Sequence, residues 1–159
     1  MFDGLELEIT HRCNKHCRWG DHRIMHSDFD VISRDDYEYI VSCIDSPERE
    51  RFRHVRLIGG EPLCHPDFAW LVRRVKIDFP AAMIQVDTNG GLLSRLPSSL
   101  LRDIDTVRLT EYPGWNDSVL RKFGPLPNVV IAPSRDFWNP YQDPDILESE
   151  ARTARNECL

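Results

Sequence analysis

The first pattern along the chain is a strict alternation of apolar and polar residues. Leu5, Leu7 and Ile9 alternate with Glu6 and Glu8, and this period of two residues predicts a β-strand with one polar face. A central strand of a parallel sheet is buried on both faces and is apolar throughout. The alternation therefore predicts that the first strand lies at an edge of its sheet.

Later parts of the chain switch repeatedly between short apolar runs and helical spacing. We predict four further strands, at residues 54–58, 83–86, 106–109 and 129–131. We predict helices at residues 33–44, 66–79, 98–102, 119–123 and 145–156. Ser33 and Asp36 have the spacing of a capping box at the start of the first helix. Cys43 falls inside that helix, where we expect a small buried hydrophobe.

This order, a strand followed by a helix five times over, predicts an α/β fold with a parallel sheet and right-handed crossovers. Five units without a strong sixth strand favour either an open, partial (β/α) barrel or a doubly wound sheet. A length of 159 residues and the absence of a linker predict one domain over residues 1–159. The sequence stops just after the last predicted helix, which suggests a truncated or unusually short core.

Charge and cysteine content narrow the function classes. The net charge of −6 offers no specific evidence for nucleic-acid binding. No stretch approaches the ~20 apolar residues of a membrane span, and the N-terminus lacks the pattern of a signal peptide. The five cysteines are an odd number and include one close pair, Cys13 and Cys17, which favours a reducing compartment and metal before disulfide. We therefore expect a cytoplasmic protein.

Three unusual segments follow the first three predicted strands. They are the loop 10–22, which carries the close cysteine pair, the turn Gly59-Gly60-Glu61-Pro62, and the turn 87–90, which reads Asp-Thr-Asn-Gly. The carboxyl ends of parallel strands meet at one rim, where α/β proteins gather their functional residues. Paired glycines let backbone approach a ligand closely, although a tight strand-to-helix turn uses them too. We expect all three segments at the same rim.

Together these segments resemble the radical S-adenosylmethionine superfamily. That family carries Cys-x3-Cys-x-aromatic-Cys after its first strand, and Cys13, Cys17 and Trp19 match its first two cysteines and its aromatic residue. The turn 59–62 matches the family's "GGEP" segment, and residues 88–90 resemble its "TNG" turn. Gly20 stands where the family has its third cysteine. The likeness covers residues 5 to 132 and implies the family's partial barrel.

The resemblance implies a mechanism and a set of site residues. Three thiolates hold a [4Fe-4S] cluster, whose open iron binds S-adenosylmethionine. An electron from an external donor then cleaves that molecule reductively to a 5′-deoxyadenosyl radical, which takes a hydrogen from the substrate. By resemblance, the metal ligands are Cys13 and Cys17, and the cofactor-binding residues are Trp19, Gly59, Gly60, Glu61, Pro62, Asn89 and Glu111. The catalytic residues and the substrate stay unknown.

Glycine has no side chain that could ligate iron, so Gly20 leaves four explanations open. The position was changed from cysteine, or the chain is a degenerate member that keeps the fold. Alternatively Asp21, His22 or Cys64 replaces the missing ligand, or the two cysteines and a histidine hold zinc. We expect a radical S-adenosylmethionine enzyme core impaired by Gly20. The alternative is a non-catalytic protein on the same scaffold that binds a nucleoside, zinc or a protein partner, and a partner could also complete the open barrel.

Overall fold

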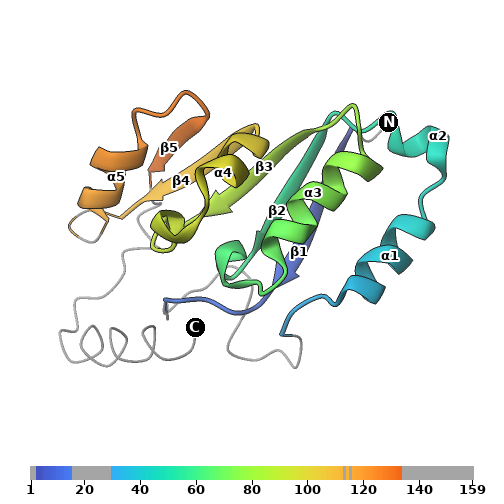
Figure 1. The fold of residues 1–159 in the computed structure, drawn as a ribbon, viewed down its shortest axis with the longest axis horizontal. Coiled ribbons are helices and arrows are strands. Elements are labelled where there is room, and N and C mark those ends of the chain that lie inside the picture. Colours follow the sequence, from blue (N-terminus) through green and yellow to red (C-terminus); the bar gives the residue numbers. More distant parts are fainter. Residues whose placement is uncertain (1–2, 16–29, 113, 115, 134–159) are drawn as a thin grey trace.

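The computed structural model describes residues 3–15, 30–112, 114 and 116–133. Within them, five strands form one sheet, in which every neighbouring pair is parallel and the strands follow their order in the chain. Figure 1 shows this order as a progression of colour from blue to orange. The strands are β1 (Gly4–Thr10), β2 (His54–Gly59), β3 (Met83–Thr88), β4 (Thr106–Glu111) and β5 (Val129–Pro133).

The described helices connect successive strands. They are α1 (Arg34–Ser42), α2 (Ser46–Arg49), α3 (Phe68–Asp78), α4 (Ser98–Asp103) and α5 (Asp117–Phe123), with short 3-10 helices at Pro62–Cys64 and Leu93–Arg95. The strand–helix alternation predicted from sequence is confirmed as far as the fifth strand. A sheet that runs in simple chain order is typical of an open barrel, whereas a doubly wound sheet reverses its order at a switch point. The structure therefore has the open, partial barrel and not the doubly wound sheet.

Local sequence explains where the first helix begins and ends. The Ser33 hydroxyl accepts a hydrogen bond from the Asp36 amide, and the Asp36 carboxylate accepts one from the Ser33 amide, which completes the predicted capping box. The expectation for Cys43 is wrong. The helix ends at Ser42, so Cys43 is the C-terminal cap, and it is exposed rather than buried.

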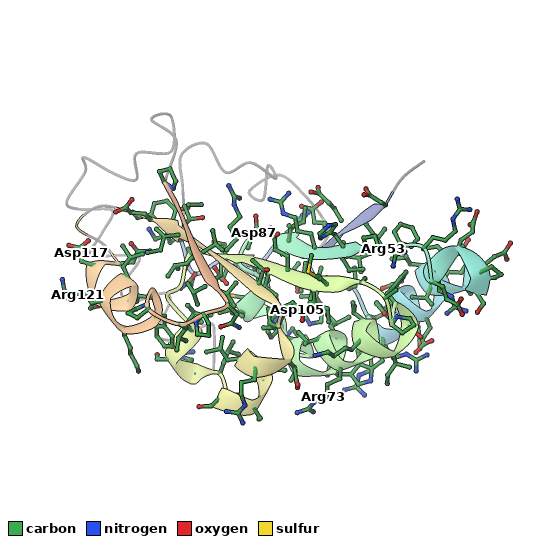
Figure 2. The ribbon with its side chains drawn as sticks, turned by 90° about the horizontal axis from the view of Figure 1, so that it is seen from above. Arg53, Arg73, Asp87, Asp105, Asp117 and Arg121 are labelled. Atoms are coloured by element: carbon green, nitrogen blue, oxygen red, sulfur yellow. The ribbon has the colours of Figure 1, made fainter. Side chains whose placement is uncertain are left out.

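The two faces of the sheet differ sharply. One face is apolar and packs against the helices, with residues such as Leu57, Ile84 and Leu109 fully buried beside Leu71 and Val75 of α3. Side chains alternate between the faces along each strand. The other face accordingly presents Glu6, Arg56, Asp87 and Arg108, and no described helix covers it. Figure 2 shows α3 and α4 on one side of the sheet only.

The predicted edge position of β1 is confirmed, because among the described residues β1 pairs only with β2, apart from one isolated bridge between Thr10 and Val31. The predicted helix at 145–156 lies outside the described residues, so the structure does not test it. None of the helices in the described ranges has the length and apolar character needed to cross a bilayer.

Candidate functional site

The carboxyl ends of β1, β2 and β3 bring the three predicted segments together. The loop that begins the cysteine motif lies against the turn after β2, since Gly60 N donates to Thr10 O at 2.8 Å and Glu61 N donates to Arg12 O at 2.8 Å. The turn after β3 joins them through Asn89, whose side chain bonds to Asn14. For the described residues of the three segments, 10–15, 59–62 and 87–90, the prediction of a shared rim is confirmed.

The base of the cysteine loop is closed by the chain itself. His11 N donates to Asp30 O at 2.8 Å, and the Arg12 guanidinium pairs with the Asp30 carboxylate at 2.6 Å from Nε to Oδ1. The Thr10 hydroxyl donates to Asp30 O and accepts from Arg12 N, both at 2.9 Å. The two ends of the segment that carries the cysteines therefore meet at one point, and Thr10 has a structural function there.

The paired glycines are required by this close approach of two backbones. A Cβ atom on Gly59 would lie 2.1 Å from Thr10 O, and one on Gly60 would lie 2.4 Å from Arg12 O. Gly59 also has a φ of 144°, which side chains disfavour. Both glycines thus allow the turn after β2 to pack on the cysteine loop. Whether this backbone also contacts a ligand stays a prediction.

Glu61 is fully buried and joins two strand ends. Its Oε1 accepts from Thr88 Oγ1 at 2.7 Å and from Leu63 N at 3.2 Å, while Oε2 accepts from Asn89 N at 2.8 Å. Burial raises the pKa of Glu61 to about 7, although these hydrogen bonds and the nearby charge of Lys15 lower it in part. The carboxyl group is therefore a buried brace whose protonation state changes near neutral pH.

Asn89 extends this brace to the cysteine loop and to β4. Its Nδ2 donates to Asn14 Oδ1 at 2.8 Å, and Asn14 directly follows Cys13 in the sequence. Its carbonyl oxygen accepts from Asn116 Nδ2 at 3.0 Å, and Asn116 Nδ2 also donates to Thr110 O at 2.8 Å. Asn116 is 1% exposed and is the N-cap residue of α5. One hydrogen-bond network thus connects the ends of all four strands from β1 to β4.

Sequence analysis missed several members of this rim. Lys15 is 8% exposed, and its Nζ lies 3.8 Å from the centre of the Tyr112 ring, just after β4. Asn116 has no motif around it, and Asn14, which directly follows Cys13, carries no sign of its partner in the sequence. Each contact joins residues far apart in the chain. Only a covariation signal between such positions could have revealed them, and a single sequence carries none.

The remaining predicted residues fall into two groups. Pro62 is buried in the 3-10 helix after the turn, Glu111 is the last residue of β4 at the same rim, and Cys13 is partly buried at the start of its loop. Cys17 and Trp19 lie outside the described residues, so their positions are not tested.

His65, three residues after Pro62, is 4% exposed and bonds through Nε2 to Ile32 O at 2.9 Å. Because its Nδ1 accepts from Asp67 N, the ring is neutral with the proton on Nε2. Burial lowers the pKa of His65, which agrees with the neutral form. His65 therefore ties the segment after β2 to the chain leading into α1.

The donor groups at this rim fit an iron–sulfur cluster only in part. The motif supplies two thiolates, Cys13 and Cys17, and the glycine at position 20 supplies none. Among the described residues, no group of three or more His, Cys, Asp or Glu side chains is arranged to hold a metal ion. A cluster of the family type would need three thiolates. The cysteine motif itself thus falls one thiolate short.

Comparison with known proteins gives related sequences and a related fold. The GTP 3′,8-cyclase of Acidothermus cellulolyticus is 34% identical over 111 residues, covering 67% of this chain and 30% of that protein. The GTP 3′,8-cyclase of Microcystis aeruginosa is 30% identical over 104 residues, covering 63% of this chain and 31% of that protein. No family model matches the sequence.

Among solved structures, one that is similar to this chain is BtrN in complex with AdoMet and 2-DOIA. It has a TM-score of 0.66 at 19% identity and covers 84% of this chain and 57% of BtrN. An open conformation of BtrN matches with a TM-score of 0.59 at 18% identity. Identities this low establish the shared fold alone, which is the open barrel derived above.

Motif, fold and relatives agree, and this chain belongs to the radical S-adenosylmethionine superfamily, of which the GTP 3′,8-cyclases are members. The predicted family and fold class are therefore confirmed. The chain spans about 30% of the length of the curated relatives that it matches.

The close packing at the turn after β2 gives a prediction for Gly59. Gly59→Ala is expected to lower the free energy of unfolding by more than about 2 kcal/mol. The new methyl group must displace the neighbouring backbone, and the alanine must also adopt the positive φ of Gly59. Gly114→Ala is the matched control, because Gly114 has a φ of 78° but its Cβ would meet no described atom within 4 Å. The G114A variant should lose about 1 kcal/mol of unfolding free energy. Equal losses in urea denaturation would contradict the packing argument.

The buried carboxyl group gives a prediction for pH dependence. Between pH 4.5, the ordinary pKa of a glutamate, and the folded pKa of about 7, the folded chain holds a proton on Glu61 that the unfolded chain has released. The free energy of unfolding should therefore fall as pH rises through this window, by at most about 1.4 kcal/mol per pH unit from this group. Urea denaturation from pH 4.5 to 7.5 measures this decrease in the free energy of unfolding.

Glu61→Gln should remove the contribution of this group to the pH dependence of the unfolding free energy. The variant protein should also be less stable at every pH, because the NH2 group of the glutamine faces the backbone N–H of Asn89. Glu48→Gln, on the exposed surface of α2, is the control and should keep the slope of the unmodified chain. An unchanged slope in the E61Q variant would show that Glu61 titrates at its ordinary pKa.

Proposed function

We propose that this chain is the cofactor-binding core of a radical S-adenosylmethionine enzyme. In this proposal Cys13 and Cys17 bind iron of a [4Fe-4S] cluster, and the rim formed by Gly59, Gly60 and Glu61 holds the methionine end of S-adenosylmethionine. The single observation that carries the proposal is the Asn14–Asn89–Glu61 network. It joins the cysteine loop to both of the other family motifs.

The other predicted residues have assigned parts in the proposal. Trp19 would lie beside the adenine, while Asn89 and Glu111 would line the rim near the nucleoside. When bound, the cluster and S-adenosylmethionine together supply reductive cleavage to a radical that takes hydrogen from a substrate. The chain's own residues supply orientation. The closed loop base at Thr10 and Asp30 fixes where the cysteine segment leaves the sheet, and the buried Glu61 fixes the distance between two strand ends.

The glycine at position 20 determines how well this core is proposed to assemble its cluster. With two thiolates in place of three, we propose that the chain assembles a cluster poorly or not at all. The rest of the rim keeps its hydrogen bonds, which supports a core altered at one ligand rather than one decayed throughout. A cytoplasmic location and an external electron donor belong to the same proposal, because cluster chemistry requires a reducing compartment.

A second candidate function is favoured by the same glycine. The chain would then be a non-catalytic member of the superfamily that uses the intact rim to bind a nucleoside, without a cluster. The two candidates make opposite predictions about what restoring a cysteine would do. The curated relatives are named for a reaction of GTP, so GTP is the first substrate to test once a cluster is present.

Restoring the third cysteine tests the proposal. After anaerobic reconstitution, the Gly20→Cys variant is expected to hold about four iron atoms and four sulfides per chain, and to form 5′-deoxyadenosine when reductant and S-adenosylmethionine are added. The unmodified chain should hold much less of both. Iron and sulfide assays with chromatography of the nucleoside product measure this.

Two controls separate a specific cluster from iron bound by chance. Cys43→Ser removes an exposed thiol far from the rim and should change nothing in either background. Cys13→Ser in the G20C background should abolish the gain. If the G20C variant holds no cluster, the enzyme-core proposal fails and the nucleoside-binding function is favoured. If the unmodified chain already holds a full, stable cluster, the proposed impairment is wrong.

A further inference from the structure

The two edges of the sheet differ in how they are protected from pairing with another strand. β1 carries Glu6 and Glu8, and residues 30–32 lie along its carboxyl end. Charged side chains and covering segments are common protection for an edge strand. β5 has no charged residue and, among the described residues, pairs with β4 alone. Apart from Pro133 at its end, β5 therefore lacks the protection that β1 has.

The register of the last two strands shows which backbone groups of β5 face away from the sheet. Val107 of β4 lies beside Val129, and its N–H donates to Asn128 O at 2.8 Å. A parallel ladder engages every second residue of a strand, so residues 128, 130 and 132 face β4. Ile131 faces outward, and its N–H and C=O have no backbone partner in the part of the chain that the structure describes. One donor and one acceptor are thus available to an added strand.

The side chains at this edge are apolar and exposed. Val130 is 54% exposed and Ile131 is 46% exposed, and they lie on opposite faces because they are neighbours in a strand. The C-terminal end of α5 lies against Ile131, since a Cβ atom on Gly124 would be 3.1 Å from Ile131 Cδ1. Figure 1 shows α5 beside β5 at one end of the sheet. An added strand would therefore cover apolar surface on both faces.

The charges beside this edge indicate the chemistry of the partner. Between residues 118 and 133 the chain has two cations, Arg121 and Lys122, and no carboxylate, although the net charge of the whole chain is −6. Both cations are exposed in the last turn of α5, and neither forms an ion pair with a described residue. Asp117, at the start of α5, accepts a hydrogen bond from Gly114 N at 3.1 Å. The edge is therefore suited to an acidic segment.

We propose that β5 is a docking edge for another protein, which adds an extended segment of apolar residues flanked by carboxylates. The backbone of that segment would pair with Ile131, and its apolar side chains would cover Ile131 and Val130. Its carboxylates would lie near Arg121 and Lys122. The inference goes beyond the proposed function, because it requires neither a cluster nor S-adenosylmethionine.

A second copy of this chain fits the edge less well than an acidic partner. Two β5 edges would bring the two cations of each copy together, and like charges repel. The acidic edge of a second copy is β1, but residues 30–32 already cover part of it. Contact between β1 and β5 would also be head-to-tail, which builds rings or open filaments rather than a discrete pair.

Designed peptides test the proposed edge on the chain without a cluster. The acidic probe has about ten residues, in which valine and threonine alternate between two glutamates at each end, and its control carries lysines in place of the glutamates. Fluorescence anisotropy at low ionic strength should show that the acidic probe binds about tenfold more tightly than the lysine peptide. N-methyl groups on two adjacent central nitrogens block both edges of the probe, and they should abolish its binding.

Charge reversal on α5 tests the electrostatic part of the proposal. Arg121→Glu and Lys122→Glu together should weaken binding of the acidic probe about tenfold and strengthen binding of the lysine peptide. Arg73→Glu is the matched control, because Arg73 is exposed on α3, away from Arg121 (Figure 2), and it should change binding less than twofold. Equal weakening by both changes, or tight binding of the N-methylated probe, overturns the inference.

Amide hydrogen exchange at Ile131 separates a partner strand from other ways of covering the edge. In the chain alone this amide should exchange quickly, and the acidic probe should slow its exchange. If the amide is already protected without the probe, the chain itself or a second copy covers the edge, and light scattering tells these two apart. That result, or a failure of the acidic probe to bind, overturns the inference. Cluster content in the G20C variant is measured independently, so failure here leaves the proposed function standing.

Discussion

The buried carboxylate of Glu61 accepts hydrogen bonds from Thr88 and from the backbone of Asn89, and so joins the ends of β2 and β3. Leaving such a group buried without partners would cost several kcal/mol, which makes the arrangement of both turns depend on it. Asn89 then holds Asn14, and the glycines at 59 and 60 let the cysteine loop lie on the same turn. The rim is thus assembled by contacts within the chain.

The division of the sheet into two faces organises everything else. Helices bury the apolar face, and the hydrophobic effect there supplies the stability of the fold. The opposite face carries charges that no described helix covers. In the proposed function, the rim at the strand ends, which carries the family motifs, binds the cofactor.

Much of the fold could be predicted from sequence, because alternation and helical spacing report local burial. All five described strands lie within two residues of their predicted bounds, and the capping box at Ser33 begins α1 as expected. Cys43 was mispredicted because the helix ends at Ser42, two residues before the predicted end at residue 44. The three motifs were expected at one rim, and their described residues are there. Their connection was not predicted, since the Asn14–Asn89 bond joins residues 75 apart and burial of Glu61 depends on tertiary packing.

The central claim is that the rim forms from the chain's own hydrogen bonds, before any cofactor binds. Amide hydrogen exchange on the metal-free chain, followed by NMR, tests it most directly. The account predicts that the amides of Asn89 and Glu61, which bond to Glu61 Oε2 and Arg12 O, exchange as slowly as that of Val86 in β3. Exchange of these two amides at the rate of exposed loop amides would contradict it.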